Sequence, residues 1–130
     1  MMTRYEKGAK FERALVHDFW ERDWAAMRSA GSGNTSLPAP DLIAAKDGKI
    51  ILVECKSTGR EKLHLKGAIL ALHEFSRVSG GRAYIAVKFL RKEPRFYEIG
   101  GLMERKRFTI SISDDYLSLD AVIGMQGTFR

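Results

Sequence analysis

The sequence predicts an α/β domain in which a mixed central β-sheet is flanked by helices. Amphipathic segments typical of helices alternate with short apolar runs typical of strands, in the order helix, strands, helix, strands, helix. The chain has 130 residues, a length that suits one domain with a sizeable core. No stretch rich in proline, glycine or serine divides it, so residues 1–130 are expected to form a single domain.

Three segments have the spacing of apolar residues that predicts helices. In residues 6–22, Phe19 follows Leu15 by one turn, and charged residues flank this apolar stripe. Residues 66–79 form a second stripe, and the two glycines that follow are a typical helix stop signal. A short last helix is expected over residues 118–125.

The clearest strand signal is a pair of apolar runs, residues 42–45 and 50–53, joined by a turn that contains Asp47 and Gly48. An Asp-Gly pair favours a type I′ hairpin turn because both central positions need a positive φ. The run 50–53 is apolar on both faces, which predicts a central strand buried on both sides. Further strands are expected over residues 25–30, 82–89, 96–99 and 108–113, and a loop over residues 31–36.

The chain has a surplus of positive charge, with 22 Lys and Arg against 16 Asp and Glu and a net charge of +6. This surplus makes a polyanion such as nucleic acid the leading candidate partner. The single cysteine excludes an intramolecular disulfide and favours a reducing compartment, so a cytoplasmic location is expected. No apolar run approaches the roughly 20 residues of a membrane span, and the first residues lack the apolar core of a secretory signal.

Charged residues follow the second apolar run of the hairpin directly. On a strand, Glu54 and Lys56 project from one face while Cys55 points to the other. Asp41 opens the first strand of the hairpin, after Pro40, and folding of the hairpin brings it near the end of the second strand. Two carboxylates and one ammonium group are therefore expected to converge.

Two neighbouring carboxylates repel each other unless a cation lies between them, and oxygen ligands suit Mg²⁺ or Mn²⁺. A nearby lysine can orient the attacking water or stabilise the charge that develops at phosphorus. The pattern Pro40-Asp41 followed by Glu54-x-Lys56 therefore fits metal-dependent hydrolysis of a phosphodiester. The alternative interpretation is a surface ion pair between Glu54 and Lys56, with Asp41 capping a turn.

This pattern resembles that of the restriction-endonuclease-like nucleases, and the resemblance implies their mixed-sheet fold for this chain. Further motifs, in the same order and spacing, resemble the archaeal Holliday junction resolvases over roughly the first two thirds of the chain. These motifs are Lys7-Gly8, Glu12-Arg13, Arg28-Ser29-Ala30-Gly31-Ser32-Gly33, Glu74-Phe75 and Ser79-Gly80-Gly81. The C-terminal third resembles that family only loosely.

The resemblance implies a homodimeric, Mg²⁺-dependent endonuclease that recognises four-way DNA junctions by shape. Such an enzyme nicks two opposed strands symmetrically, leaves 5′-phosphates, and serves homologous recombination and DNA repair. By motif, Asp41 and Glu54 correspond to metal ligands and Lys56 to the catalytic lysine. Two other functions remain open: a nuclease of the same fold that acts on flaps or nicks, and a non-catalytic basic DNA-binding module.

The resemblance also implies roles for three more residues. Glu12 corresponds to a helix glutamate that completes the acidic site as a catalytic residue and metal ligand, and Ser32 to a serine implicated in catalysis. The main-chain carbonyl of Cys55 corresponds to a further metal ligand, with the thiol facing the core. Glu12 lies at the edge of the apolar stripe of its helix, although a solvated surface charge is the alternative. Ser32 is alternatively a simple turn residue.

One residue common in the family is missing. Members commonly have a glutamine early in the second helix, near the active site, where this chain has Gly67-Ala68-Ile69. Lys66 is the candidate replacement. The loss is expected to affect the rate of turnover more than the type of reaction.

Basic residues near the motifs are predicted to contact DNA phosphates, which positions the DNA without reading its sequence. They are Arg4, Lys7, Lys10, Arg28, Arg60, Lys62 and Lys66. The alternative for each is a solvated side chain, the interpretation favoured for residues 91–92 and 105–107. Candidates for a dimer surface, since a chain of this size is not expected to bury them all, are Phe96, Tyr97, Leu102, Met103 and Phe108.

Overall fold

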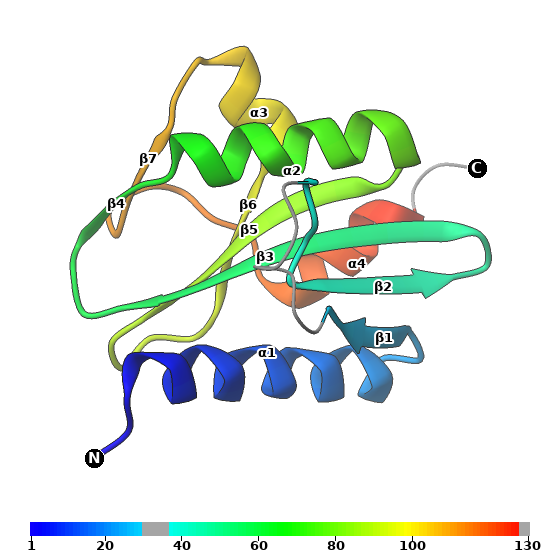
Figure 1. Cartoon of the computed structure of the whole chain (residues 1–130). Coiled ribbons are helices and arrows are strands. Elements are labelled where there is room, and N and C mark those ends of the chain that lie inside the picture. The colour runs from blue at the N-terminus through cyan, green and yellow to red at the C-terminus, as the bar shows by residue number, and fades with distance from the viewer. Residues whose placement is uncertain (30–36, 128–130) are drawn as a thin grey trace.

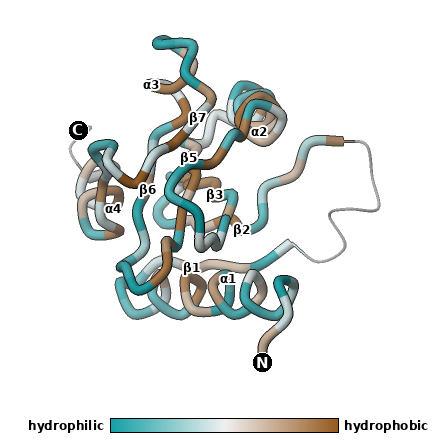
Figure 2. The backbone as a smooth tube through the Cα atoms, turned by 90° about the vertical axis from the view of Figure 1, so that its left-hand side faces the viewer, coloured by the Kyte–Doolittle hydropathy of each residue, from teal (hydrophilic) through white to brown (hydrophobic). Residues whose placement is uncertain are grey.

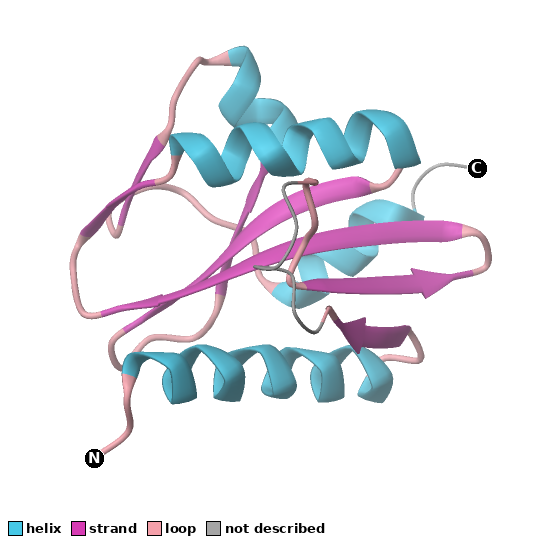
Figure 3. Ribbon diagram, in the orientation of Figure 1, coloured by secondary structure: helices cyan, strands magenta, loops and turns pink. Residues whose placement is uncertain are grey.

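A five-stranded β-sheet forms the centre of the molecule, with its strands in the order β1-β2-β3-β5-β6 (Figures 1 and 3). The structure, a computed structural model, describes residues 1–29 and 37–127. The strands are β1 (Ala25–Arg28), β2 (Leu42–Lys46), β3 (Lys49–Thr58), β4 (Lys62–His64), β5 (Arg82–Phe89), β6 (Arg95–Glu98) and β7 (Thr109–Ser111). The helices are α1 (Arg4–Glu21), α2 (Lys66–Ser79), α3 (Ile99–Glu104) and α4 (Leu119–Gly127). Strands β3 and β5 are parallel and the other neighbours in this sheet are antiparallel, so the predicted mixed sheet flanked by helices is confirmed.

Helices cover both faces of this sheet (Figure 1). Helices α1 and α4 pack on one face, where Leu15, Val122 and Ile51 of β3 belong to one core cluster. Helices α2 and α3 pack on the other face, where Ile69 and Leu52 of β3 belong to a second core cluster. Figure 2 shows the apolar residues of the sheet lying between these two layers. Strand β3 thus contributes to both halves of the core, as expected for a central strand.

Local sequence sets the start of α1 and the end of α2. The Thr3 side chain accepts a hydrogen bond from the Glu6 amide at 3.1 Å, and Glu6 accepts one from the Thr3 amide at 3.3 Å, which forms a capping box. Gly80 ends α2 in the left-handed conformation, with φ 79°. Helix α2 has the predicted bounds, and α1 begins slightly earlier than predicted. Among the described helices, none combines the length and the apolar character needed to cross a membrane.

The hairpin of β2 and β3 forms as predicted. Asp47 has φ 51° and Gly48 has φ 78°, the positive values that a type I′ turn requires. Val53 is fully buried, and β3 continues beyond it to Thr58 because β5 pairs with it over that whole length. The strand is therefore longer than the apolar run that predicts it.

Two elements were not predicted from the sequence. Strand β4 pairs with β7 in a separate two-stranded sheet, and α3 begins at Ile99, where a strand residue was expected. The strand expected over residues 108–113 is shorter than predicted and forms as β7 over Thr109–Ser111. Strand β4 has only three residues, too few for an alternating pattern, and it forms because β7 lies beside it in the folded chain.

Three of the five residues expected on a dimer surface are buried in the core. Phe96 is 0% exposed, Tyr97 6% and Leu102 5%. The prediction was wrong for these residues because it did not foresee that α3 and α4 cover β6. Met103 and Phe108 are partly buried against the core cluster beneath α2 and α3.

We predict that Gly81→Ala destabilises the fold, because a Cβ at this position would lie 2.9 Å from Cγ2 of Ile50 and 3.2 Å from Cγ of Leu52. Overpacking of this kind costs about 1–3 kcal/mol, measured as a loss of unfolding free energy in urea. Gly67→Ala is the matched control, since an added Cβ there meets no atom within 4 Å. It should be neutral or slightly stabilising, and equal effects of the two changes would contradict the packing explanation.

Candidate active site

The hydrogen-bond ladder between β2 and β3 ends at the pair Leu42 and Val53, although β3 itself continues. Hydrogen-bonded pairs alternate along an antiparallel ladder, so the next such pair would join residue 40 to residue 55. Pro40 has no N–H group to donate. The carbonyl of Cys55 therefore receives no hydrogen bond from β2 and faces the side of β3 where, among residues 1–29 and 37–127, no further strand pairs.

The Asp41 side chain takes the place of the second hydrogen bond of this pair, the one that the Cys55 amide would donate to residue 40. Its Oδ2 atom accepts the N–H of Cys55 at 2.8 Å. The main-chain carbonyl of Asp41 accepts the amide of Ser29 at 2.8 Å, which holds this segment against the end of β1. The prediction that the hairpin brings Asp41 to the end of the apolar strand is confirmed.

Glu54 and Lys56 project from the same face of β3, with 3.9 Å between Glu54 Oε2 and Lys56 Nζ. The Glu54 side chain is only 19% exposed. Burial and then the charge of Asp41 raise the pKa of Glu54 to about 7, and the Lys56 ammonium opposes this shift. The pair is thus more than a surface ion pair, because Glu54 also lies against a second carboxylate.

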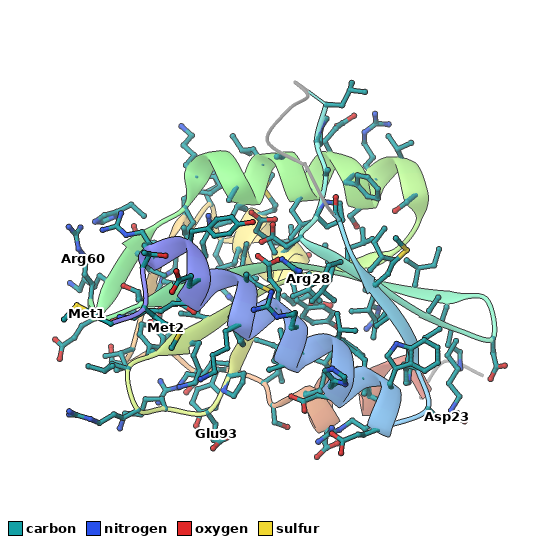
Figure 4. The ribbon with its side chains drawn as sticks, turned by 60° about the horizontal axis from the view of Figure 1, so that its bottom comes forward. Met1, Met2, Asp23, Arg28, Arg60 and Glu93 are labelled. Atoms are coloured by element: carbon teal, nitrogen blue, oxygen red, sulfur yellow. The ribbon has the colours of Figure 1, made fainter. Side chains whose placement is uncertain are left out.

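Glu12 faces the same site from α1. Burial raises its pKa, and the charge of Asp41 adds to the shift. The side chain is 17% exposed, so the alternative of a solvated surface charge is wrong. Its Oε1 accepts a hydrogen bond from Nε of Arg28 at 3.0 Å, and Figure 4 shows Arg28 lying beside α1. Sequence reasoning missed this ion pair, because only the packing of α1 on β1 brings the two side chains together.

The Cys55 side chain lies on the opposite face of β3 from Glu54 and Lys56, with its thiol in the core, as predicted. The residue is 8% exposed and belongs to the core cluster between α1 and the sheet. Burial raises the pKa of the thiol well above its usual value, and the carboxylates of Asp41, Glu12 and Glu54 raise it further. The thiol therefore stays protonated and acts as a packing group.

The remaining oxygen atoms suit a hard divalent cation. Within residues 1–29 and 37–127, no three His, Cys, Asp or Glu side chains stand close enough together to hold a metal ion. Glu12 is engaged with Arg28, which leaves the carboxylate pair Asp41 and Glu54 and the free carbonyl of Cys55. Oxygen donors of this kind fit Mg²⁺, which completes its shell with water, and a cation would relieve the repulsion that raises the pKa of Glu54.

Most of the predicted DNA contacts lie on the surface. The exposed ones are Arg4, Lys7, Lys10, Arg60, Lys62 and Lys66. Arg60 and Met1 lie at the same end of the molecule, so the start of α1 and the segment after β3 share that end (Figures 1 and 4). The ammonium of Lys66 lies 5.7 Å from the centroid of the Phe108 ring. Ser32 lies outside the described residues.

The fold and the carboxylate pair on its hairpin define an α/β protein of the nuclease type. The archaeal Holliday junction resolvase (Hjc) family model matches residues 3–128. Crossover junction endodeoxyribonuclease Hjc of Archaeoglobus fulgidus is 33% identical over 114 residues, which cover 87% of this chain and 83% of that protein. The Sulfolobus acidocaldarius Hjc is 35% identical over 103 residues, covering 75% and 72% of the two chains.

A solved structure agrees with these matches. The 1.6 Å resolution structure of Archaeoglobus fulgidus Hjc, a Holliday junction resolvase, superposes with a TM-score of 0.79 and 33% identity over 89% of this chain and 98% of that chain. The chain belongs to the archaeal Holliday junction resolvase family. The predicted family and the predicted enzyme class, a junction-resolving endonuclease, are confirmed, and the match extends into the C-terminal third.

We predict that the metal-free protein loses stability as the pH rises from about 4.5 to about 7. Glu54 has a pKa of about 7 in the folded state against 4.5 as the ordinary value, so within this window the folded chain holds a proton that the unfolded chain has released. The unfolding free energy should fall by at most about 3 kcal/mol across the window.

Urea unfolding in EDTA at a series of pH values measures this loss. Glu54→Gln cannot titrate at this position, so its unfolding free energy should fall less than that of the wild type, and the fall that remains is the part due to Glu12, whose pKa is also raised. Parallel curves for the wild type and Glu54→Gln would contradict the assignment of the raised pKa to Glu54.

Proposed function

We propose that the chain resolves four-way DNA junctions in homologous recombination and DNA repair by paired, symmetric nicks that leave 5′-phosphates. The observation that carries this proposal is the approach of Asp41 to Glu54 beside the open Cys55 carbonyl, in a chain of the resolvase family. We place residues 1–130 in one nuclease domain that acts in the cytoplasm.

Asp41, Glu54 and the Cys55 carbonyl would hold Mg²⁺, or Mn²⁺ in its place, and Glu12 would assist after release from Arg28. When bound, the cation supplies activation of a water molecule and neutralises charge on the phosphate. The shared repulsion of the two carboxylates supports this assignment, because it disappears when a divalent cation lies between them.

The chain's own basic groups would orient the reactants. Lys56 projects from the same face of β3 as Glu54, which supports a role in which its ammonium would hold the attacking water or the charge that develops on the phosphate. Arg28 would exchange its Glu12 carboxylate for a DNA phosphate, since both are anions that a guanidinium binds in the same way. Ser32 is proposed as a further catalytic residue in the adjoining segment.

The substrate surface would extend from the site over the exposed basic residues at the start of α1 and after β3. These residues contact phosphates and do not distinguish sequences, which suits recognition by shape. A four-way junction has two-fold related strands to be cut, and a homodimer with two such sites matches that symmetry. The mass of the purified chain by light scattering tests the dimer.

The central test is Glu54→Gln in assays of binding and of Mg²⁺-dependent nicking of a synthetic four-way junction. We expect nicking to be lost, because a neutral amide is a poor metal ligand, while binding persists through the basic surface. Glu104→Gln, which changes an exposed carboxylate of α3, is the matched control and should nick as the wild type does. Unchanged nicking by Glu54→Gln would contradict the proposed mechanism.

The same assay separates the alternative functions. A wild-type chain that binds junctions but nicks no DNA would be a binding module. One that cuts flaps, nicked DNA or linear duplex as readily as junctions would be a nuclease of this fold without junction selectivity.

We predict that replacing Arg60 and Lys62 together by alanine weakens junction binding and its dependence on salt. Each phosphate contact contributes about 0.9 to the slope of log K against log salt concentration, so the slope should fall by about 2. The rate of nicking at saturating protein should stay near the wild-type value. The pair Arg91→Ala and Lys92→Ala, in a segment predicted to be solvated, is the control. Equal slopes for the two double variants would contradict the proposed surface.

A further inference from the structure

We propose that the main-chain amide of Ser57 binds a phosphodiester oxygen of the DNA strand at the active site. The proposal rests on the nuclease function and adds a substrate-binding group that the carboxylates and the lysine do not supply. It concerns the open edge of β3 and depends on which way each backbone group of that strand points.

The direction of these groups follows from the printed hydrogen bonds. The Ser29 amide donates to the Asp41 carbonyl, so the backbone of residue 41 faces β1 and that of Leu42 faces β3. Leu42 pairs with Val53, and the Cys55 amide donates to the Asp41 side chain on the same side. Because backbone groups alternate along a strand, the amide of Ser57 also points to this side.

Within the described part of the chain, no strand pairs with that side of β3 beyond the start of β2. The β2 ladder ends at Val53, whereas β5 accompanies β3 to Thr58 on the opposite side. Figure 1 shows β3 extending past the beginning of β2 with β5 along its other edge. Among the described residues, no side chain or loop atom accepts a hydrogen bond from Ser57. Its amide is therefore a donor available at the edge of the site.

The Ser57 amide lies on the same strand edge as the Cys55 carbonyl, beside the acidic groups. Cys55 and Ser57 are two residues apart on one edge, about 7 Å along the strand. The first presents a carbonyl, which attracts a cation, and the second presents an N–H, which attracts an anion. A phosphate bound beside a cation at the Cys55 carbonyl would therefore find its hydrogen-bond donor at Ser57. The edge of β3 next to the acidic pair thus offers a carbonyl for the cation and an N–H donor for the phosphodiester that the cation binds.

The test compares Ser57→Pro with Ser57→Ala. Proline removes the N–H, whereas alanine keeps it and removes only the hydroxyl. Because the backbone of residue 57 faces away from β5, proline deletes no hydrogen bond between β3 and β5 and is tolerated at such an edge position. A second comparison uses a variant in which residue 57 is the α-hydroxy analogue of alanine. This variant has an ester oxygen in place of the N–H, and its control is Ser57→Ala.

We expect Ser57→Ala to bind and nick a four-way junction as the wild type does. The proline and ester variants should lose about tenfold or more in junction affinity measured with Ca²⁺, or in single-turnover nicking with Mg²⁺, as for a lost hydrogen bond to a charged group. Their thermal unfolding and their Mn²⁺ affinity without DNA should match those of Ser57→Ala.

Two results would overturn the inference. One is an ester variant that binds and nicks like Ser57→Ala. The other is an equal loss in Ser57→Ala, which would assign the effect to the hydroxyl. Failure of the nuclease function itself is distinguishable, because the wild type would then not nick the junction at all.

Discussion

The site depends on one constraint: β3 extends several residues beyond the point where its pairing with β2 ends. Strand β2 cannot extend its ladder past Leu42, because Pro40 has no amide to donate, while β5 supports β3 as far as Thr58. Backbone groups left inside a protein need partners, and the Asp41 carboxylate satisfies the first of them. The interaction that completes the sheet therefore also positions a carboxylate at the site.

The electrostatics of the site follow from this arrangement. Each carboxylate beside Asp41 is paired with a basic side chain. Glu54 Oε2 lies 3.9 Å from Lys56 Nζ, and Glu12 Oε1 accepts a hydrogen bond from Arg28 Nε at 3.0 Å. Burial of carboxylates near one another is unfavourable, as the raised pKa values of Glu54 and Glu12 indicate, and the two bases offset part of that cost. DNA phosphates would compete for the same bases, so substrate binding and release of the carboxylates toward a cation are linked in the proposed mechanism.

Local signals account for the elements that the sequence predicted well. The positive φ values at Asp47 and Gly48, and the left-handed Gly80 after α2, depend on residues within a few positions of each turn. Elements without such signals were missed: β4 is stabilised by β7, far along the chain, and α3 follows β6 without a side-chain cap. The burial of Phe96 was likewise unpredictable, because it depends on α4 packing over the edge of the sheet.

For the site, the sequence by itself determined the residue types, their alternation on β3 and the turn that returns Asp41 to them. Those features follow from spacings along one hairpin. Only the tertiary structure decided that Glu12 meets Arg28, that Glu54 is buried enough for its pKa to reach about 7, and that the edge of β3 stays open. Distance, burial and strand pairing depend on what packs around a residue, and a linear pattern does not specify them.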